Sequence, residues 1–253
     1  MKTIVAIGGG EIGRPGYKIE TEKIDREIIK YSGKKHPKFL FIPTASSDSA
    51  LYAKTVNDYF GKKLGCKVDV LNLVGVKVSK KEIENKILAT DIVYVGGGNT
   101  MKMLDIWKQK GVEKILKKAW NKGIIISGLS AGAVCWFKNF SSDSKKFVEG
   151  KEKYELIRLE GLGWLPMSYC PHFDTEEKRK PHLKKMMKEI DGTAVAVENC
   201  CALIIRDDEY RIVNSKKGAQ AFKTFWHKGR YNIQKIKTSK KFKPVNDLIS
   251  QSE

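Results

Sequence analysis

Apolar runs alternate with amphipathic segments through the first half of the chain. Apolar residues recur at helical spacing between the runs, as at Ile24, Ile28 and Ile29, and Ser79 with Glu82 three residues later forms a capping-box pattern. The runs that read as strands are residues 3–7, 39–42, 67–71, 92–95 and 124–127. Strands separated by helices predict an α/β fold, a three-layer sandwich whose mostly parallel sheet carries helices on both faces. Functional sites in such sheets lie at the carboxyl ends of the strands.

The pattern changes after about residue 139. Short strand-like runs at residues 193–197, 202–205 and 211–213 lie close together, and turn-forming Lys-Gly pairs follow at residues 217–218 and 228–229. This spacing predicts a C-terminal antiparallel extension of the same fold. We therefore expect one domain over residues 1–237 and a polar, peripheral C-terminal tail over residues 238–253.

Charge and cysteine content narrow the possible partners. The chain has 253 residues and a formal net charge of +19, but its lysines are spread along helix-like segments and no RNA-binding aromatic motif or zinc-knuckle spacing accompanies them. We therefore expect no specific nucleic-acid partner. The five cysteines show neither metal-ligand spacing nor a disulfide framework, which predicts buried, inert thiols. The four scattered histidines offer no metal site, and the sequence predicts no cofactor.

The location of the protein is predicted from what the sequence lacks. No apolar stretch approaches the roughly 18 residues of a membrane-spanning helix. The chain begins directly with a strand-like run rather than with the zones of a signal peptide. We expect a cytoplasmic protein that does not bind membranes, and the sequence leaves open whether it is a monomer or a homodimer.

The first of three motifs at predicted strand ends is GGGEIG, residues 8–13. It matches the glycine fingerprint of dinucleotide-binding folds, which also needs a helix opening there and an acidic residue ending the second strand. Pro15 interrupts the segment, and the second strand ends in IPTASS, residues 42–47, without an acid. The sequence therefore disfavours dinucleotide binding.

The second motif is VGGGNT, residues 95–100. Three glycines leave the backbone bare, so its N–H groups can approach a ligand closely. Asn99 or Thr100 can then cap the following helix. The motif predicts a cradle for an anion or an oxyanion.

The third motif is GLSAG, residues 128–132, directly after the isoleucine-rich strand. It fits the nucleophile-elbow pattern, in which small residues around a cramped turn expose the serine hydroxyl at the edge of the sheet. We expect Ser130 to be a nucleophile. The N–H of Ala131 would then point to the place where an oxyanion forms.

A serine nucleophile needs a base, and the base needs a residue that orients it. His172 is the best candidate base, because it ends an apolar run at a proline, whereas His182 lies in a basic helix and reads as a surface residue. Asp174 is too close in sequence to orient the base, and Asp143 lies in a polar loop. Glu198 ends an otherwise uncharged strand, where a carboxylate is costly unless it is paired. We therefore predict that Glu198 orients His172.

Together these residues resemble the serine peptidases typified by aspartyl dipeptidase (peptidase E), to which cyanophycinase is a more distant relative. The resemblance covers residues 38–226 and rests on VGGGNT, GLSAGA, the Pro-His-Phe of residues 171–173 and Glu198 after a short strand. It implies a flavodoxin-like sheet similar to that of class I glutamine amidotransferases. It also implies a Ser130–His172–Glu198 triad and an oxyanion hole made by the N–H groups of Gly98 and Ala131.

One position departs from this family. Aspartyl dipeptidases carry an arginine early on the helix after the histidine motif, where it holds the substrate's aspartate; here Glu176 is the nearest alignable residue, and Arg179 follows one turn later. Glu176 would repel an aspartyl side chain, which argues against strict Asp-X specificity. The residues expected to bind substrate are Gly97, Asn99, Asp143, Glu176 and Arg179.

These expectations define one principal function and one alternative. The principal function is a serine-type peptidase or amidase, similar to a dipeptidase, that cleaves short peptides through an acyl-enzyme. A carboxylate such as Glu176 or Asp143 would hold the free α-amino group of the substrate. The alternative is a non-catalytic ligand-binding or regulatory protein on the same fold.

Overall fold

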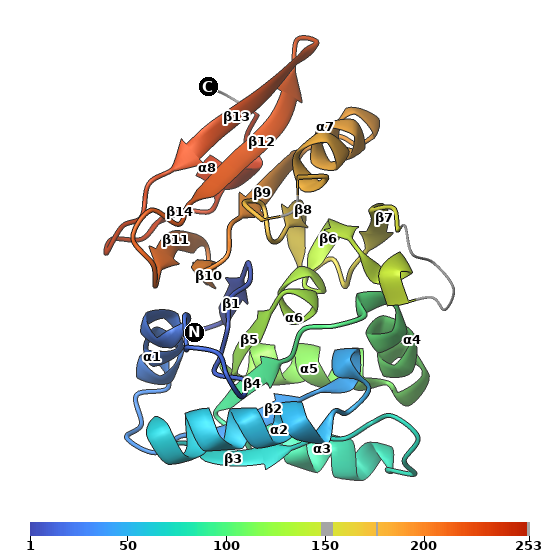
Figure 1. Cartoon of the computed structure of the whole chain (residues 1–253), viewed down its shortest axis with the longest axis vertical. Helices are drawn as coiled ribbons and strands as arrows, with labels where there is room; N and C mark the ends of the chain where they lie inside the picture. The colour runs from blue at the N-terminus through green and yellow to red at the C-terminus, as the bar shows by residue number, and fades with distance from the viewer. Residues whose placement is uncertain (148–153, 176, 252–253) are drawn as a thin grey trace.

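The computed structural model describes residues 1–147, 154–175 and 177–251, and its strands form two sheets (Figure 1). The strands of the first sheet are β1 (Thr3–Ile7), β2 (Lys38–Ile42), β3 (Lys67–Val70), β4 (Ile92–Val95), β5 (Ile125–Leu129), β10 (Cys201–Arg206), β11 (Glu209–Asn214) and β14 (Lys243–Pro244). Their spatial order is β14-β11-β10-β1-β5-β4-β2-β3. The five strands from β1 to β3 in this order are parallel, and β10, β11 and β14 extend the sheet with antiparallel pairing.

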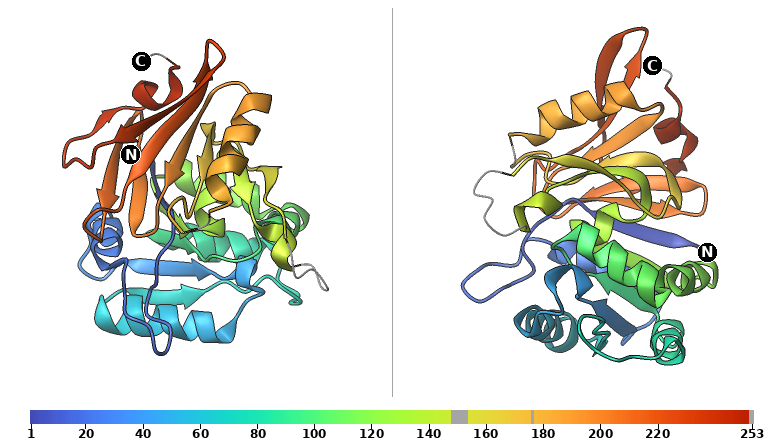
Figure 2. Two further views of the ribbon diagram at one scale, coloured as in Figure 1. Left: turned by 45° about the horizontal axis from the view of Figure 1, so that its top comes forward. Right: turned by 90° about the vertical axis from the view of Figure 1, so that its right-hand side faces the viewer.

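The second sheet lies beside the first and carries the later part of the chain. Its strands are β6 (Phe137–Ser142), β7 (Ile157–Glu160), β8 (Leu165–Cys170), β9 (Thr193–Val197), β12 (Ala221–His227) and β13 (Arg230–Ile236). Their order is β13-β12-β9-β8-β6-β7, with parallel pairing from β6 through β8 to β9. Figure 2 shows the blue-to-green N-terminal half and the yellow-to-red C-terminal half from two further sides.

Helices cover both faces of the first sheet. The helices of the described residues are α1 (Glu22–Tyr31), α2 (Ala50–Val56), α3 (Lys80–Leu88), α4 (Thr100–Lys110), α5 (Val112–Asn121), α6 (Ala131–Val134), α7 (Arg179–Glu189) and α8 (Asn246–Ile249), with the short segments η1 (Thr44–Ser46), η2 (Asn57–Lys63) and η3 (Ser144–Phe147). Of these, α7 packs against the second sheet, and α8 packs against β8 and β9 of that sheet and against β14 of the first. Side chains alternate along β1, so that Val5 and Ile7 pack in one cluster with α1 and η2. Ile4 and Ala6 pack in the other cluster with α3, α4 and α5. The predicted three-layer α/β architecture is confirmed.

Local sequence signals predicted several elements well. The strands at residues 3–7, 92–95 and 193–197 have the predicted bounds, and Ser79 and Glu82 form the predicted capping box. The expectation of one sheet with an extension was incomplete, because β9 joins β8 and β12 in a sheet of its own. Which sheet a strand joins depends on distant partners, and local periodicity does not report them.

The polar tail packs onto the domain rather than lying at its periphery. Lys243 pairs with Tyr210 of β11, and Leu248 of α8 is 1% exposed. The Thr193 hydroxyl donates a hydrogen bond to the carbonyl of Leu248 at 2.6 Å. One buried leucine and two strand residues therefore attach a segment whose composition is otherwise polar.

Two sequence-based expectations concern cysteines and membrane segments. All five cysteines are buried and free, as predicted. In the described parts of the chain, no helix combines the length and the apolar composition needed to cross a bilayer.

A buried carboxyl group joins α1 to η2. Asp25 is 0% exposed and accepts hydrogen bonds from the Thr21 hydroxyl at 2.7 Å and from the Tyr59 hydroxyl at 2.8 Å. Its other oxygen, Oδ1, is buried and has no hydrogen-bond partner. Burial raises the pKa of Asp25 to about 7, against an ordinary value of 3.8. Below about pH 7 the folded protein therefore favours the protonated carboxyl group.

This shift predicts a pH dependence of stability. An acid whose pKa is raised by folding stabilises the protein fully below its unfolded pKa, and this contribution falls as pH rises toward about 7. Between pH 4 and pH 7 we expect the free energy of unfolding of the wild type to fall by an amount on the order of a few kcal/mol from this group. Asp25→Asn should lack this fall, because an amide does not titrate. Urea unfolding of both proteins at pH 5 and pH 8 checks this. An unchanged difference between the two pH values in the variant would contradict it.

Candidate functional site

The GLSAG segment forms a strained turn between β5 and α6. Ser130 has φ 55° and ψ −111°, a conformation that residues with a side chain rarely adopt. The flanking glycines permit the packing: a Cβ on Gly128 would lie 2.2 Å from the Gly132 carbonyl oxygen, and one on Gly132 would lie 2.1 Å from that of Val95. Ser130 N–H donates to the Ile7 carbonyl at 3.0 Å. The turn therefore holds the Ser130 hydroxyl at the carboxyl end of the central strands.

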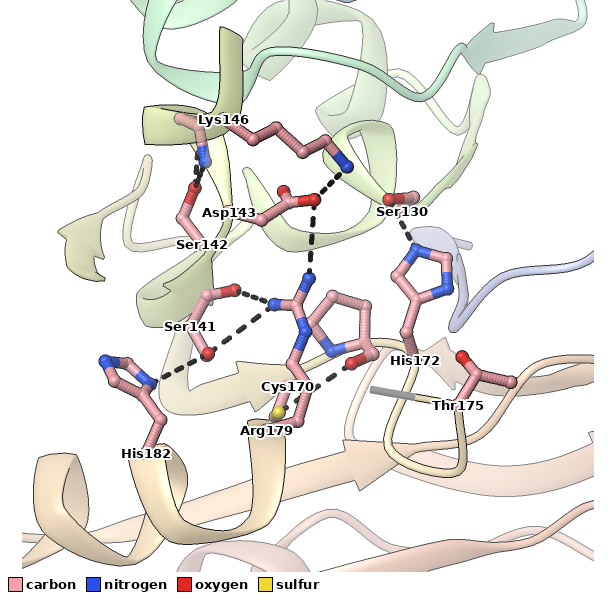
Figure 3. Close-up of polar contacts among 12 residues, drawn as sticks. Ser130, Ser141, Ser142, Asp143, Lys146, Cys170, His172, Thr175, Arg179 and His182 are labelled. Carbon is pink, nitrogen blue, oxygen red and sulfur yellow. Dashed lines mark hydrogen bonds and ion pairs between the residues drawn. The ribbon is translucent and has the colours of Figure 1, made fainter. Parts of the chain in front are cut away.

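His172 meets this hydroxyl from the second sheet. It follows β8 and also has a left-handed backbone, with φ 51°. Its Nε2 lies 2.8 Å from Ser130 Oγ (Figure 3). The structure thus brings together the two residues that the sequence predicted as nucleophile and base.

Asn199 contacts the other ring nitrogen of His172. The Asn199 Oδ1 atom lies 2.7 Å from His172 Nδ1. An amide oxygen only accepts hydrogen bonds, so Nδ1 carries the proton and Nε2 is left to accept from the Ser130 hydroxyl. Asn199 is held by Nδ2 donating to Thr175 Oγ1 at 3.0 Å and by its backbone N–H donating to Asp174 Oδ1 at 2.9 Å. This geometry fixes the tautomer that a general base needs.

The structure does not bring Glu198 to the imidazole, and this corrects the expected contact. Glu198 Oε2 accepts instead from the backbone N–H of Gln220 at 2.8 Å, on the side facing β12. Burial raises the pKa of Glu198 above its ordinary value, and the nearby Asp174 adds to this, although the Gln220 N–H opposes it. The Glu198 carboxylate therefore has a hydrogen-bond partner, as its position at a strand end predicted, but the partner is the backbone N–H just before β12 rather than His172.

The first glycine motif lies beneath the histidine. A Cβ on Gly9 would lie 1.9 Å from Asn199 Oδ1 and 2.4 Å from the His172 ring, and one on Gly8 would lie 2.4 Å from the Glu198 carbonyl oxygen. The segment does not open a helix, since α1 begins only at Glu22. These glycines therefore allow the end of β1 to approach the His172–Asn199 pair.

The second glycine motif lies beside the serine. A Cβ on Gly97 would lie 3.5 Å from Ser130 Cβ. Gly98 has φ 139°, and a Cβ there would lie 2.2 Å from the Ala45 carbonyl oxygen. Among the loop, cap and side-chain hydrogen bonds of the described residues, none uses the N–H of Gly98 or Ala131 as a donor. Ala131 is 3% exposed, and neither residue is among those that line the cavity beside Ser130, so their role as oxyanion donors stays a prediction.

A cavity of about 520 Å³ opens beside Ser130 and His172. It is lined by Gly10, Glu11, Ile12, Arg14, Ser49, Leu51, Tyr52, Thr55, Gly97, Leu129, Ser130, Lys146 and His172. Glu11 Oε1 accepts three backbone N–H groups, including that of Arg14 at 2.8 Å, and Oε2 accepts from Arg14 Nε at 2.6 Å. Burial raises the pKa of Glu11, but these bonds lower it overall. Glu11 is therefore ionised, and its negative charge is balanced by Arg14.

A polar network supports the wall of this cavity that carries Lys146 (Figure 3). Lys146 forms an ion pair with Asp143, whose carboxylate also lies 3.8 Å from the guanidinium of Arg179. Arg179 is 1% exposed and donates to the Ser141 carbonyl at 2.9 Å. His182 was expected at the surface but is half-buried and bonded to Ser141 Oγ at 2.9 Å, and burial lowers its pKa.

The residues expected to bind substrate have different locations. Gly97 lines the cavity. Asn99 caps α4, with its Oδ1 accepting from Lys102 N–H at 3.1 Å. Asp143 contacts Lys146 and Arg179, and neither Asp143 nor Arg179 lines the cavity. Glu176 lies outside the described residues. In the part of the chain that the structure describes, no cluster of His, Cys, Asp and Glu is arranged to hold a metal ion.

Sequence reasoning missed Asn199, Gly9, Arg14 and Lys146. An asparagine at a strand end resembles an ordinary turn residue in the sequence, although an asparagine orients the base in some cysteine proteases. Gly9 belongs to a motif whose pattern matches a nucleotide-binding fingerprint, and the pattern gives no sign of the contact with His172. Arg14 and Lys146 were two cations among 48 lysines and arginines, and only the fold shows which of these face the serine.

Comparison with known proteins identifies the class and then the family. The chain has the fold of a peptidase: a crystal structure of a peptidase from an acI-B1 Actinobacterium superimposes with a TM-score of 0.69 at 17% identity, covering 96% of this chain and 97% of that one. The family model of peptidase family S51 matches residues 4–213. This protein belongs to peptidase family S51.

Two relatives agree with this assignment. The uncharacterized peptidase YgaJ of Bacillus subtilis (strain 168) is 34% identical over 227 residues, which cover 88% of this chain and 92% of the relative. Peptidase E of Streptomyces coelicolor is 26% identical over 141 residues, covering 53% and 56% of the two chains.

Proposed function

We propose that this protein is a serine peptidase that cleaves short peptides with Ser130 as nucleophile and His172 as general base. The observation that carries the proposal is the 2.8 Å contact between Ser130 Oγ and His172 Nε2 at the wall of a cavity. The strained backbone at both residues supports it, because such strain is retained mainly where function requires it.

In the proposed reaction, Ser130 Oγ attacks the substrate carbonyl while His172 Nε2 takes its proton. The N–H groups of Gly98 and Ala131 stabilise the oxyanion, which is commonly a large contribution to catalysis. His172 then protonates the leaving amine, and water hydrolyses the acyl-enzyme. Asn199 keeps the imidazole in the reactive tautomer through Nδ1–H. It carries no charge and therefore stabilises the imidazolium less than a carboxylate would.

The cavity favours substrates with a free carboxylate. Of its two cations, Arg14 is paired with Glu11 and Lys146 with Asp143. Asp143 also lies 3.8 Å from Arg179, so three cations share two carboxylates and the group carries one positive charge in excess. Asp143 is paired with Lys146, which disfavours our earlier expectation that it holds an α-amino group. A cavity of about 520 Å³ suits a peptide of a few residues.

Lys146→Gln is expected to raise KM for a dipeptide with a free C-terminal carboxylate about tenfold or more, because it removes a charge-assisted hydrogen bond. The same dipeptide with an amidated C-terminus should show no comparable change. Lys138→Gln is the matched control, since Lys138 is an exposed lysine on β6 that does not line the cavity. Equal KM changes for both peptides would show that Lys146 does not bind the carboxylate.

The nucleophile is tested by labelling with a fluorophosphonate and locating the adduct by mass spectrometry. A single adduct on Ser130 is expected, absent in Ser130→Ala and strongly reduced in His172→Ala. His36→Ala, which alters an exposed histidine bonded to the Gly65 carbonyl, should label normally. A folded wild-type protein that hydrolyses no peptide and gives no adduct would favour the non-catalytic ligand-binding alternative.

A further inference from the structure

A second cavity, of about 640 Å³, lies far from Ser130. We call it the arginine cavity; it is lined by Glu27, Lys30, Tyr31, Arg206, Arg211, Lys240 and Phe242. Its position follows from the topology, because Arg206 pairs with Thr3 at the start of β1, whereas Gly9 follows the other end of that strand. The arginine cavity is therefore separate from the Ser130–His172 site.

Arg211 organises one wall of the arginine cavity and has its partners within the protein. Its Nε donates to the Tyr31 hydroxyl at 3.0 Å, and Nη2 forms an ion pair with Glu27. The Arg211 side chain is 10% exposed. This pairing uses the one carboxylate among the lining residues.

Arg206 is held in place without an anion. Its guanidinium lies 5.0 Å from the centroids of both the Tyr31 and Phe242 rings. Within the described residues it forms no ion pair, and its Nε is buried without a hydrogen-bond partner. The neighbouring acid, Asp207, accepts instead from the backbone N–H of Lys2 at 2.8 Å.

The nearest acceptor to Arg206 does not satisfy it. Nη2 lies 2.6 Å from the thioether sulfur of Met1, which is a weak acceptor and carries no charge. A buried donor without a partner costs on the order of a hydrogen bond, more so when the group is charged. The aromatic rings offset part of this cost by cation–π attraction but leave the Nε–H unpaired.

Two lysines add further positive charge to the arginine cavity. Lys30 lies in the last turn of α1 and Lys240 precedes Phe242 in the C-terminal segment, and both line the arginine cavity. Four cationic side chains thus face one carboxylate, which Arg211 already pairs. Arginine with flanking lysines is the arrangement that recognises the oxygens of a phosphate group.

We propose that the arginine cavity binds a phosphate group, either as the free ion or as a phosphate monoester, with Arg206 as the central donor. Lys30 and Lys240 supply the remaining positive charge. The site does not depend on the proposed peptidase chemistry, since it shares no residue with the Ser130 cavity.

Calorimetric titration of the full chain with inorganic phosphate, at ionic strength matched with chloride, tests this proposal. We expect one saturable site whose Kd rises at least about tenfold in Arg206→Gln, the loss of one charge-assisted contact. Lys240→Gln is the second test variant, to be used if Arg206→Gln does not fold. It removes another charge from the cavity lining and should also weaken phosphate binding. Lys138→Gln removes an exposed charge elsewhere and should bind as the wild type does.

The outcomes separate the proposal from diffuse attraction to a chain of charge +19. Equal weakening in Lys240→Gln and Lys138→Gln, or no saturable binding by the wild type, would overturn it. Titration with phenyl phosphate distinguishes the two sources of the group. Tighter binding than inorganic phosphate indicates an ester as ligand, and equal binding indicates the free ion.

Discussion

Ser130→Ala is expected to lower kcat for peptide hydrolysis by about 10⁴-fold or more, the usual cost of losing the nucleophile of such a site. The fold should be retained, because Gly128, Gly132 and the Ser130 N–H hold the turn without the hydroxyl. Steady-state kinetics and circular dichroism of the same preparation check both statements.

Two variants make this result specific. Ser127→Ala removes a hydroxyl from the same strand, where Oγ donates to the buried Val93 carbonyl at 2.8 Å, and should cost stability but not kcat. Ser130→Gly should be as inactive as Ser130→Ala and more stable than it, because glycine adopts φ 55°, ψ −111° without strain. Substantial hydrolysis by Ser130→Ala would show that the nucleophile is another group.

Asn199→Ala is expected to lower kcat/KM by about 10²- to 10⁴-fold, because His172 loses the acceptor that fixes its tautomer. Glu198→Gln is the matched neighbour and should stay within about threefold of the wild type, since Glu198 accepts from the Gln220 backbone. The larger loss in Glu198→Gln would mean that the carboxylate reaches the imidazole during catalysis and that the resemblance to peptidase E predicted the orienting residue correctly.

The same pair of residues predicts a pH dependence. Asn199→Asp places a carboxylate at His172 Nδ1, which favours the imidazolium and raises the pKa of His172. The base must be neutral to accept the Ser130 proton, so activity should require a higher pH. We expect the acidic limb of the kcat/KM profile to move up by about one pH unit or more. An unmoved limb would show that residue 199 does not contact the base in solution.

The sequence predicted the elements and the contact between Ser130 and His172 because both leave local signals in the sequence. The strand at residues 92–95, the Ser79 capping box and the GLSAG turn each depend on a few neighbouring residues. The proline before His172 likewise indicates the end of a strand. A single sequence is enough to predict these features, because the residues that cause each of them lie within one turn or one strand.

The parts that could not be predicted depend on distant pairing. Asn199 rather than Glu198 meets His172 because β9 pairs with β12, and this pairing directs the Glu198 carboxylate to Gln220. The exposure of His182 was misjudged because Ser141 and Arg179 surround it only after β6 and α7 pack. A shift of one residue at a strand end is enough to exchange two candidate side chains.

The position of β1 has a consequence for the newly made chain. This strand is synthesised first, but it pairs with β5 on one side and with β10, which ends at Arg206, on the other. Gly9 can approach Asn199 only after the ribosome has released nearly all of the protein, a wait on the order of tens of seconds. The contacts among Ser130, His172 and Asn199 therefore form only late in biosynthesis, when most of the chain has been made.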